Sequence, residues 1–210
     1  MSDRMKDLLR LDSETCTRYT IVKGVPRQSV ASHSFRVAVI ALELANLLNL
    51  CGASHKAAIL EWALVHDGPE AATGDIQHPV KVWLEKQVGV PGIKGLFPLM
   101  EEMEKDLCPW IKEYWDQSTI IYDVVFVADR LEMADFLYPY ITREDVKRMR
   151  DGLISDIHAV VERRGRDWGN AVGQILVDFA DQRTPWQRME DNKQRQFPTP
   201  SSSPETGSPA

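Results

Sequence analysis

The chain has 210 residues, of which 43% are hydrophobic and 27% are charged, a balance typical of one globular domain with a real core. Its formal net charge of -6 argues against a broad basic surface for a nucleic-acid polymer, but it is compatible with a small cationic pocket for one nucleotide. The three cysteines, Cys16, Cys51 and Cys108, are too widely spaced for a zinc-type pair or a disulfide framework, which favours a reducing cytoplasm.

No segment reads as a membrane span. The N-terminal run MSDRMKDLLRLDSE lacks the apolar core of a signal peptide. The longest apolar stretch, residues 37–50, is interrupted by Glu43 and Asn46 and is too short to cross a bilayer. We therefore expect a cytoplasmic protein without a membrane partner.

The N-terminal third predicts two helices joined by an irregular segment. Residues 5–11 read as a short amphipathic helix. Residues 18–30 contain Gly24, Pro26 and β-branched side chains, which favours an extended loop. Apolar residues recur so densely over residues 32–50 that this helix is expected to be buried on most sides.

The remaining elements are also predicted to be helical. Ser54 is the expected N-cap of a helix that runs to about Asp67, where Gly68-Pro69 stops it because proline cannot continue the hydrogen-bond ladder. Further helices are expected over residues 99–105, 120–137, 145–162 and 168–181. Strand signals are nearly absent, so the fold class is predicted to be all-α.

The end of the chain differs in composition from the rest. Beyond about Arg183 it becomes rich in Pro and Ser, ending in QFPTPSSSPETGSPA. Such a segment cannot bury enough apolar surface to offset its ordering entropy. We therefore expect one folded domain over residues 1–183 and a disordered tail over residues 184–210.

Four side chains form a potential metal site: His33, His66, Asp67 and Asp129. The adjacent pair His66-Asp67 can share an ion only near a helix end, which Gly68-Pro69 supplies. Two imidazoles and two carboxylates suit Mn, Co, Fe or Zn better than Ca, and they leave coordination positions open for water and phosphate. Structural alternatives are a core histidine, a chance His-Asp dipeptide and an aspartate paired with Arg130, and spacing alone does not decide between them.

The surrounding motifs resemble a known family. The run HDGPEAATGD is followed closely by HPVK, and it is preceded by Arg18-Tyr19 and by a histidine motif at residues 31–34. With the later Asp129, this order resembles the HD-domain superfamily, and more narrowly the YfbR-type 5′-deoxynucleotidases and the DatZ-type phage dATP triphosphohydrolases. The resemblance extends from about Arg18 to Leu137. It implies an all-α HD-domain helical bundle that is a homo-oligomer, a dimer or larger.

The resemblance also implies a chemistry. One divalent transition metal per chain (Co, Mn or Zn) would be held by His33, His66, Asp67 and Asp129. A water activated by this metal would attack the 5′-phosphate of a 2′-deoxynucleotide. The implied catalytic residues are Asp67 and Glu70, with Glu70 orienting the water or acting as general acid or base.

The residues implied to contact the substrate are Arg18, Tyr19, Ile21, Asp75, His78, Pro79 and Lys81. Arg18 and Lys81 would hold phosphate oxygens, and Asp75 would accept a hydrogen bond from the sugar 3′-hydroxyl. Tyr19 would pack on the base or sugar, although an aromatic residue in such a loop is more often part of the core. It stands where relatives often carry tryptophan, and His78 and Gly68-Pro69 also depart from the bacterial pattern, so base preference and phosphate number stay open.

Three functional classes compete. The first is a hydrolase that releases the deoxynucleoside from a monophosphate or from a triphosphate such as dATP. Ile21 and the compact chain suit the phage branch of this class. The second is a cyclic-dinucleotide phosphodiesterase, whose GYP signature is absent from the sequence. The third is a non-catalytic nucleotide- or metal-binding module, which the complete ligand set and Glu70 disfavour.

Overall fold

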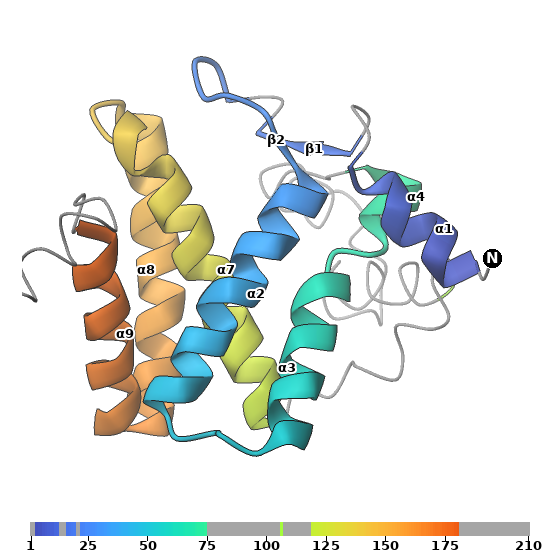
Figure 1. The fold of residues 1–210 in the computed structure, drawn as a ribbon. Coiled ribbons are helices and arrows are strands. Elements are labelled where there is room, and N and C mark those ends of the chain that lie inside the picture. The colour runs from blue at the N-terminus through green and yellow to red at the C-terminus, as the bar shows by residue number, and fades with distance from the viewer. Residues whose placement is uncertain (1–2, 13–15, 20–21, 75–105, 107–118, 181–210) are drawn as a thin grey trace, which may run out of the picture. The chain divides into compact units, whose positions relative to one another are not determined.

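The computed structural model describes residues 3–12, 16–19, 22–74, 106 and 119–180. Within these ranges the chain is mainly helical (Figure 1). The helices are α1 (Asp3–Arg10), α2 (Val30–Leu47), α3 (Ala53–Val65), α4 (Glu70–Thr73), α7 (Ile120–Leu137), the 3-10 helix η2 (Tyr138–Tyr140), α8 (Glu144–Arg164) and α9 (Arg166–Ala180). The strands β1 (Thr17–Arg18) and β2 (Gln28–Ser29) have two residues each, so the predicted all-α class is confirmed.

The predicted helices of the described ranges are present, with one wrong detail. α7 covers residues 120–137 as predicted, and α8 and α9 begin and end within two residues of the expected positions. Ser54 is not the N-cap of α3, because the helix already begins at Ala53. Gly52 takes the cap position in extended backbone, and its carbonyl accepts a hydrogen bond from the Lys56 amide at 3.0 Å.

Part of the expected loop over residues 18–30 forms a small antiparallel hairpin. Thr17 pairs with Ser29, and Arg18 pairs with Gln28. Tyr19, with φ +63°, and Gly24, with φ +78°, turn the chain between the two strands. Because Arg18 and Gln28 lie opposite one another in register, their side chains leave the hairpin on the same face.

The core is built where three long helices meet. α2 packs against both α3 and α7, α3 also packs against α7, and α8 packs on α7 (Figure 1). The inward-facing apolar side chains of α2 and α7 are buried; those fully covered include Val37, Leu44, Val124, Val127 and Leu131. The prediction that α2 is buried on most sides is wrong, because only half of it is buried and Phe35 and Val39 are exposed. The packing of the three helices brings together the start of α2, the end of α3 and the middle of α7.

α2 is long and apolar enough to match a membrane span by length and composition, with a mean hydropathy of 1.2 over 18 residues. Half of this window is buried inside the protein, where α2 packs on α3 and α7. The core helix of a folded domain has the same properties. The buried His33 in its first turn fits that interpretation.

A buried carboxylate joins the start of α7 to the end of α8. Asp123 is 1% exposed and lies in the first turn of α7. Its two oxygens pair with Arg163 at 2.6 Å and with Arg164 at 2.5 Å, in the last turn of α8. The negative Asp123 lies at the partly positive N-terminus of α7, and the two positive arginines lie at the partly negative C-terminus of α8, so both placements are favourable. The two helix termini are therefore linked electrostatically.

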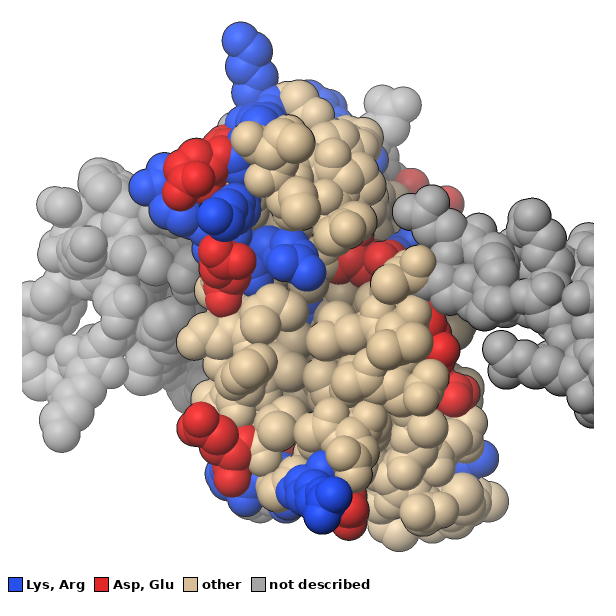
Figure 2. All heavy atoms as spheres, turned by 90° about the vertical axis from the view of Figure 1, so that its left-hand side faces the viewer, with Lys and Arg blue, Asp and Glu red and all other residues tan. Residues whose placement is uncertain are grey.

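The chain divides into a compact unit over Met1–Leu176 and a second unit over Val177–Ala210. The predicted helix at residues 99–105 and the predicted boundary and tail after residue 183 lie outside the described residues. One face of the described part is shown in Figure 2. Basic and acidic side chains lie next to one another above and below a broad uncharged area there, and they form no continuous basic surface on this face.

Candidate metal centre

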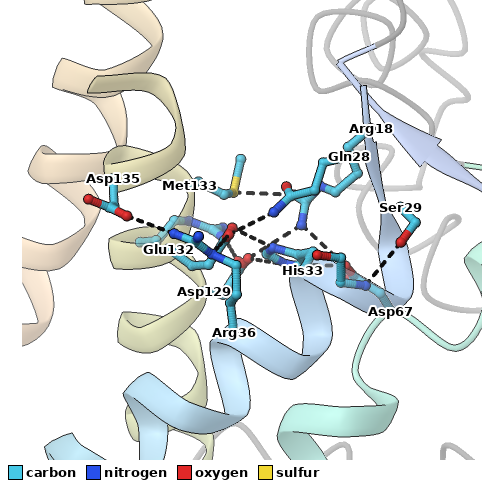
Figure 3. A network of polar contacts seen from close by, with 12 residues as sticks. Arg18, Gln28, Ser29, His33, Arg36, Asp67, Asp129, Glu132, Met133 and Asp135 are labelled. Carbon is cyan, nitrogen blue, oxygen red and sulfur yellow. Dashed lines mark hydrogen bonds and ion pairs between the residues drawn. The ribbon is translucent and has the colours of Figure 1, made fainter. Parts of the chain in front are cut away.

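The structure brings the four predicted ligands together. His33 comes from α2, Asp129 from α7, and Asp67 from the turn after α3 (Figure 3). His66 precedes Asp67 in the chain, directly after the last residue of α3. Nε2 of His33 lies 3.0 Å from Oδ1 of Asp129. Oδ2 of Asp67 lies 3.5 Å from Nε2 of each histidine. Donor atoms of His33, His66 and Asp129 all lie within 4.8 Å of one another, a spacing that one ion can bridge.

The helix end after Val65 explains how two adjacent residues face one point. α3 stops at Val65, and the Gly68 amide returns to the Val65 carbonyl at 2.8 Å. The chain therefore turns at His66 and Asp67 instead of continuing the helix, as the Gly68-Pro69 stop predicts. The carbonyl of Asp67 then accepts from the amide of Glu70 at 3.0 Å, which begins α4.

Each histidine ring is held by its Nδ1 atom. Nδ1 of His66 lies 2.8 Å from the carbonyl oxygen of Ala63, and Nδ1 of His33 lies 2.6 Å from Oε2 of Glu132. A carbonyl or carboxylate oxygen only accepts, so we assign the proton of each neutral ring to Nδ1. Both Nε2 lone pairs then face the cluster.

This geometry fits a cation. Nε2 of His33, Nε2 of His66 and Oδ1 of Asp129 are buried and make no hydrogen bond within the described part of the protein. Buried acceptors without a donor are costly, at about 1–3 kcal/mol each. Nε2 of His33 and Oδ1 of Asp129, 3.0 Å apart, need a proton or a metal cation between them. The mixed nitrogen and oxygen donors match those of divalent transition metals.

The two aspartates are held in the ionised form that ligation requires. Burial alone would raise the pKa of Asp129, but the charges of Arg130 and Arg18 hold it well below its usual value. Burial opposes ionisation of Asp67 too, and the charge of Arg18 lowers its pKa. Both carboxylates therefore carry a negative charge near neutral pH.

Asp129 also forms the ion pair with Arg130 that was named as the structural alternative to metal binding, and it uses its other oxygen for this. Its Oδ2 pairs with the guanidinium of Arg130, while its Oδ1 faces His33. Arg130 is itself fixed, since it lies over the ring of Phe126 at 4.4 Å and its Nε is 3.2 Å from Asp156. One carboxylate thus joins a surface ion pair to the cluster.

Arg18 lies beside the ligands. Its NH1 atom is 3.4 Å from Oδ2 of Asp67 and 3.8 Å from Oδ1 of Asp129, and its NH2 atom is 3.2 Å from the sulfur of Met133. Burial alone would lower the pKa of Arg18, but Asp67 and Asp129 outweigh it and raise the pKa above its ordinary value. A permanently charged guanidinium therefore stands next to the cluster, and its contact with phosphate stays a prediction.

The remaining predicted site residues have different positions. Glu70 begins α4 and lies close enough to Arg18 for its charge to help raise the pKa of that guanidinium. Tyr19 is 3% exposed and stacks on Phe136 with ring centroids 5.0 Å apart. The structure thus gives Tyr19 the core position named as its alternative, and its contact with substrate stays a prediction. Ile21, Asp75, His78, Pro79 and Lys81 lie outside the described residues.

Sequence reasoning missed the polar residues behind His33. Glu132 contacts His33, and Gln28 and Arg36 contact Glu132. The available signal was the spacing of Asp129 and Glu132, which lie three residues apart and so on one face of a helix. The sequence around Gln28 gave no sign of a role at this site, because the hairpin of β1 and β2 determines where its side chain lies.

Comparison with known proteins agrees with this geometry. A profile described as the HD domain matches residues 13–150. A dATP triphosphohydrolase of Salmonella phage PMBT28 is 29% identical over 194 residues, covering 88% of this chain and 93% of the phage protein. A dATP triphosphohydrolase of Acinetobacter phage SH-Ab 15497 is 31% identical over 146 residues, covering 65% of this chain and 67% of the phage protein. A 5′-deoxynucleotidase of Vibrio parahaemolyticus is 30% identical over 103 residues, covering 45% of this chain and 53% of that protein.

Solved structures show the same fold. The HD phosphohydrolase of cyanophage S-2L, DatZ, bound to dA and one catalytic Zn²⁺ ion, superposes with a TM-score of 0.61 at 19% identity. That match covers 86% of this chain and 95% of the phage protein. A conserved hypothetical protein from Pyrococcus furiosus superposes with a TM-score of 0.55 at 27% identity, covering 77% of this chain and 96% of the other.

Proposed function

This chain belongs to the HD-domain family, and we propose that it is a metal-dependent phosphohydrolase that removes phosphate from the 5′ position of 2′-deoxynucleotides. The observation that carries the proposal is the convergence of His33, His66 and Asp129, whose three facing atoms are buried and make no hydrogen bond in the described part of the protein. Asp67 joins them, with Oδ2 3.5 Å from Nε2 of each histidine. The relatives named as dATP triphosphohydrolases and 5′-deoxynucleotidase support the substrate class.

The residues divide the work by their chemistry. When bound, a divalent cation supplies a Lewis acid for the phosphoryl oxygens and lowers the pKa of water. His33, His66, Asp67 and Asp129 would hold it, leaving positions open. Arg18, beside Asp67, offers a planar fork to two phosphate oxygens. Glu70, at the start of α4, would orient the attacking water or move its proton.

Specificity for dATP is the second candidate within this class of hydrolases. It is favoured by the two phage relatives, of which the first matches 93% of its own length. A triphosphatase of this kind would release deoxyadenosine and tripolyphosphate, whereas a monophosphatase would release a nucleoside and inorganic phosphate. A non-catalytic module remains the contrasting hypothesis, and it predicts metal or nucleotide binding without turnover.

The setting of the enzyme is part of the proposal. We expect one Co²⁺, Mn²⁺ or Zn²⁺ ion per chain, a homo-oligomer, a cytoplasmic location, and neither nucleic-acid polymers nor membranes as partners. Light scattering at working concentration tests the oligomer, and a monomer there contradicts it. The bound Zn²⁺ of the cyanophage protein makes zinc the first metal to assay.

The direct test is product analysis by chromatography. The metal-stripped protein is incubated with all four deoxynucleoside mono- and triphosphates, each with Zn²⁺, Co²⁺, Mn²⁺ or none. Formation of a deoxynucleoside only with metal supports the proposal, and the co-product distinguishes tripolyphosphate from phosphate. Metal binding without turnover on every substrate would reject catalysis and favour the binding module.

The choice of sugar is tested in the same assay. The resemblance implies that Asp75 and Lys81 anchor the 3′-hydroxyl and the phosphate, leaving the 2′ edge near His78 and Pro79. A ribose 2′-hydroxyl without a partner there costs about 1–3 kcal/mol, or roughly 5- to 150-fold in kcat/KM. Equal kcat/KM for dAMP and AMP, and for dATP and ATP, would show that this segment does not distinguish the sugars.

A further inference from the structure

A second carboxylate stands directly behind the metal-ligating His33. The side chains of His33 and Glu132 are both 0% exposed, and Oε2 of Glu132 lies 2.6 Å from Nδ1 of His33. Glu132 is not a candidate ligand, because it contacts the ring atom opposite Nε2, the atom that faces the cluster. A fully buried carboxylate is costly unless it is fixed by partners, so its presence here calls for a role.

Two carboxylates from one turn of α7 contact the two ring nitrogens of His33. Asp129 and Glu132 lie three residues apart and so project from the same helix face. Oδ1 of Asp129 lies 3.0 Å from Nε2, and Oε2 of Glu132 lies 2.6 Å from Nδ1 (Figure 3). The imidazole of α2 is therefore fixed in orientation by a single rigid element.

Glu132 is held in turn by side chains from two other elements. Its Oε1 accepts a hydrogen bond from Nε2 of Gln28, on β2, at 2.8 Å. The same oxygen pairs with Nε of Arg36, on α2, at 2.7 Å, and Arg36 also pairs with Asp135 at 2.7 Å. The amide of Gln28 and the guanidinium of Arg36 thus hold the Glu132 carboxylate in place.

We infer that Glu132 is a positioning residue that accepts a hydrogen bond from the Nδ1–H group of His33. This hydrogen bond directs the Nε2 lone pair into the metal centre and makes the imidazole a stronger ligand. A carboxylate behind a ligating imidazole raises its basicity and fixes its tautomer. The inference rests on the proposed function only in taking the four-residue cluster as a metal centre. His66 has a neutral backbone carbonyl of Ala63 in the equivalent place, so a charged acceptor supports only one of the two rings.

The test compares metal affinities. Metal-stripped wild type, Glu132→Gln and Asp135→Asn are titrated with Co²⁺ against a competing chelator, and the visible spectrum of bound Co²⁺ is recorded. Glutamine has nearly the shape of glutamate, but its amide nitrogen only donates hydrogen bonds. It therefore cannot accept one hydrogen bond from His33 and another from Gln28 on its two terminal atoms, as Glu132 does. We expect Glu132→Gln to bind Co²⁺ about 10- to 100-fold more weakly with an altered spectrum.

Asp135→Asn is the matched control. Asp135 also pairs with Arg36 and lies on the same helix, three residues beyond Glu132. No contact joins it to His33 in the described structure, so the control should bind Co²⁺ within about threefold of wild type. An affinity of Glu132→Gln within threefold of wild type, with an unchanged spectrum, overturns the inference and leaves the proposed function standing. Failure of wild type to bind any divalent metal overturns both.

A measurement on wild type covers the case in which Glu132→Gln does not fold. Nitrogen-15 NMR of the Zn²⁺-loaded protein should show His33 protonated at Nδ1, with the strongly deshielded proton of a short hydrogen bond to a carboxylate. The Nδ1 proton of His66, which faces a neutral carbonyl, should be less deshielded. The absence of a protected Nδ1 proton on His33 overturns the inference independently of any variant.

Discussion

At the scale of single residues, the centre combines charges that would be unfavourable alone. Asp129 and Arg18 are buried, Asp67 is partly buried, and Arg18 lies beside both carboxylates. The charge of Arg18 lowers the cost of placing the two aspartates together, since opposite charges in a medium of low dielectric constant attract strongly. Removing the Arg18 charge would therefore raise the pKa of both aspartates.

Glu70→Ala is expected to keep the metal and to lose turnover. Glu70 is outside the cluster of close donor atoms yet within electrostatic range of Arg18. A positioned acid or base contributes about 10²- to 10⁴-fold to rate. Metal content by atomic spectroscopy and kcat on the preferred deoxynucleotide check this, with the exposed Glu162→Ala on α8 as control. A wild-type rate in Glu70→Ala would show that this carboxylate takes no part in proton transfer.

Arg18→Lys separates charge from shape. Lysine keeps the positive charge beside Asp67 but loses the planar fork that grips two phosphate oxygens. Loss of one charge-assisted hydrogen bond costs about 1.5–3 kcal/mol, so we expect kcat/KM to fall about 10- to 100-fold. Steady-state kinetics measures this, and bound metal is quantified alongside. An unchanged kcat/KM would mean that Arg18 serves only the buried aspartates.

The ligand set could be predicted from sequence because its residue types are rare together and because Gly68-Pro69 fixes a helix end. Glu132 could not be singled out in the same way. Its importance depends on a tertiary contact with a residue 99 positions away, and its one local signal, the three-residue spacing from Asp129, does not separate it from a surface glutamate. The core position of Tyr19 could not be decided from sequence either, because the ring on which it stacks, Phe136, comes from a helix that is distant in the sequence.

At the scale of elements, periodicity predicted the long helices but not all of their ends, and not their pairing. The apolar pattern of α7 predicted both of its ends, and the structure shows that Thr119 caps its first turn. The cap of α3 was not, because Gly52 reaches extended backbone without a side-chain acceptor. The hairpin of β1 and β2 was read as a loop, since two-residue strands carry too few positions for an alternating pattern.

Asp123→Asn tests the link between the termini of α7 and α8. The substitution removes the charge that Arg163 and Arg164 face. Arg163 is 59% exposed and keeps its hydration, so the expected loss is about 1–2 kcal/mol of unfolding free energy and not that of a fully buried pair. Urea denaturation measures it, and Asp151→Asn, exposed on α8, is the control. Equal midpoints for the two variants would contradict the link.

At the scale of the whole molecule, the metal centre joins α2, α7 and the end of α3. A ligand that binds only the folded state stabilises it by an amount that grows with the logarithm of its concentration divided by its dissociation constant. The centre should therefore act as a cross-link between helices that already pack on one another. Its loss is expected to weaken the whole fold as well as the chemistry.

Removing the metal is expected to lower the melting temperature and abolish turnover. At 100 times the dissociation constant, a bound metal adds about 2.7 kcal/mol, which corresponds to roughly 5–10 °C for a chain of this size. Calorimetry with increasing Zn²⁺ checks this, and Asp67→Asn should show a smaller rise. Full turnover of a metal-stripped protein would contradict the proposed role of the centre.

The order of the ligands along the chain has a consequence during synthesis. His33, His66 and Asp67 leave the ribosome first, while Asp129 and the helix that carries it are made much later. Until α7 docks, the nascent chain offers an incomplete donor set and no Glu132 behind His33. We therefore expect the complete set of donors to bind a cation only after α7 has docked.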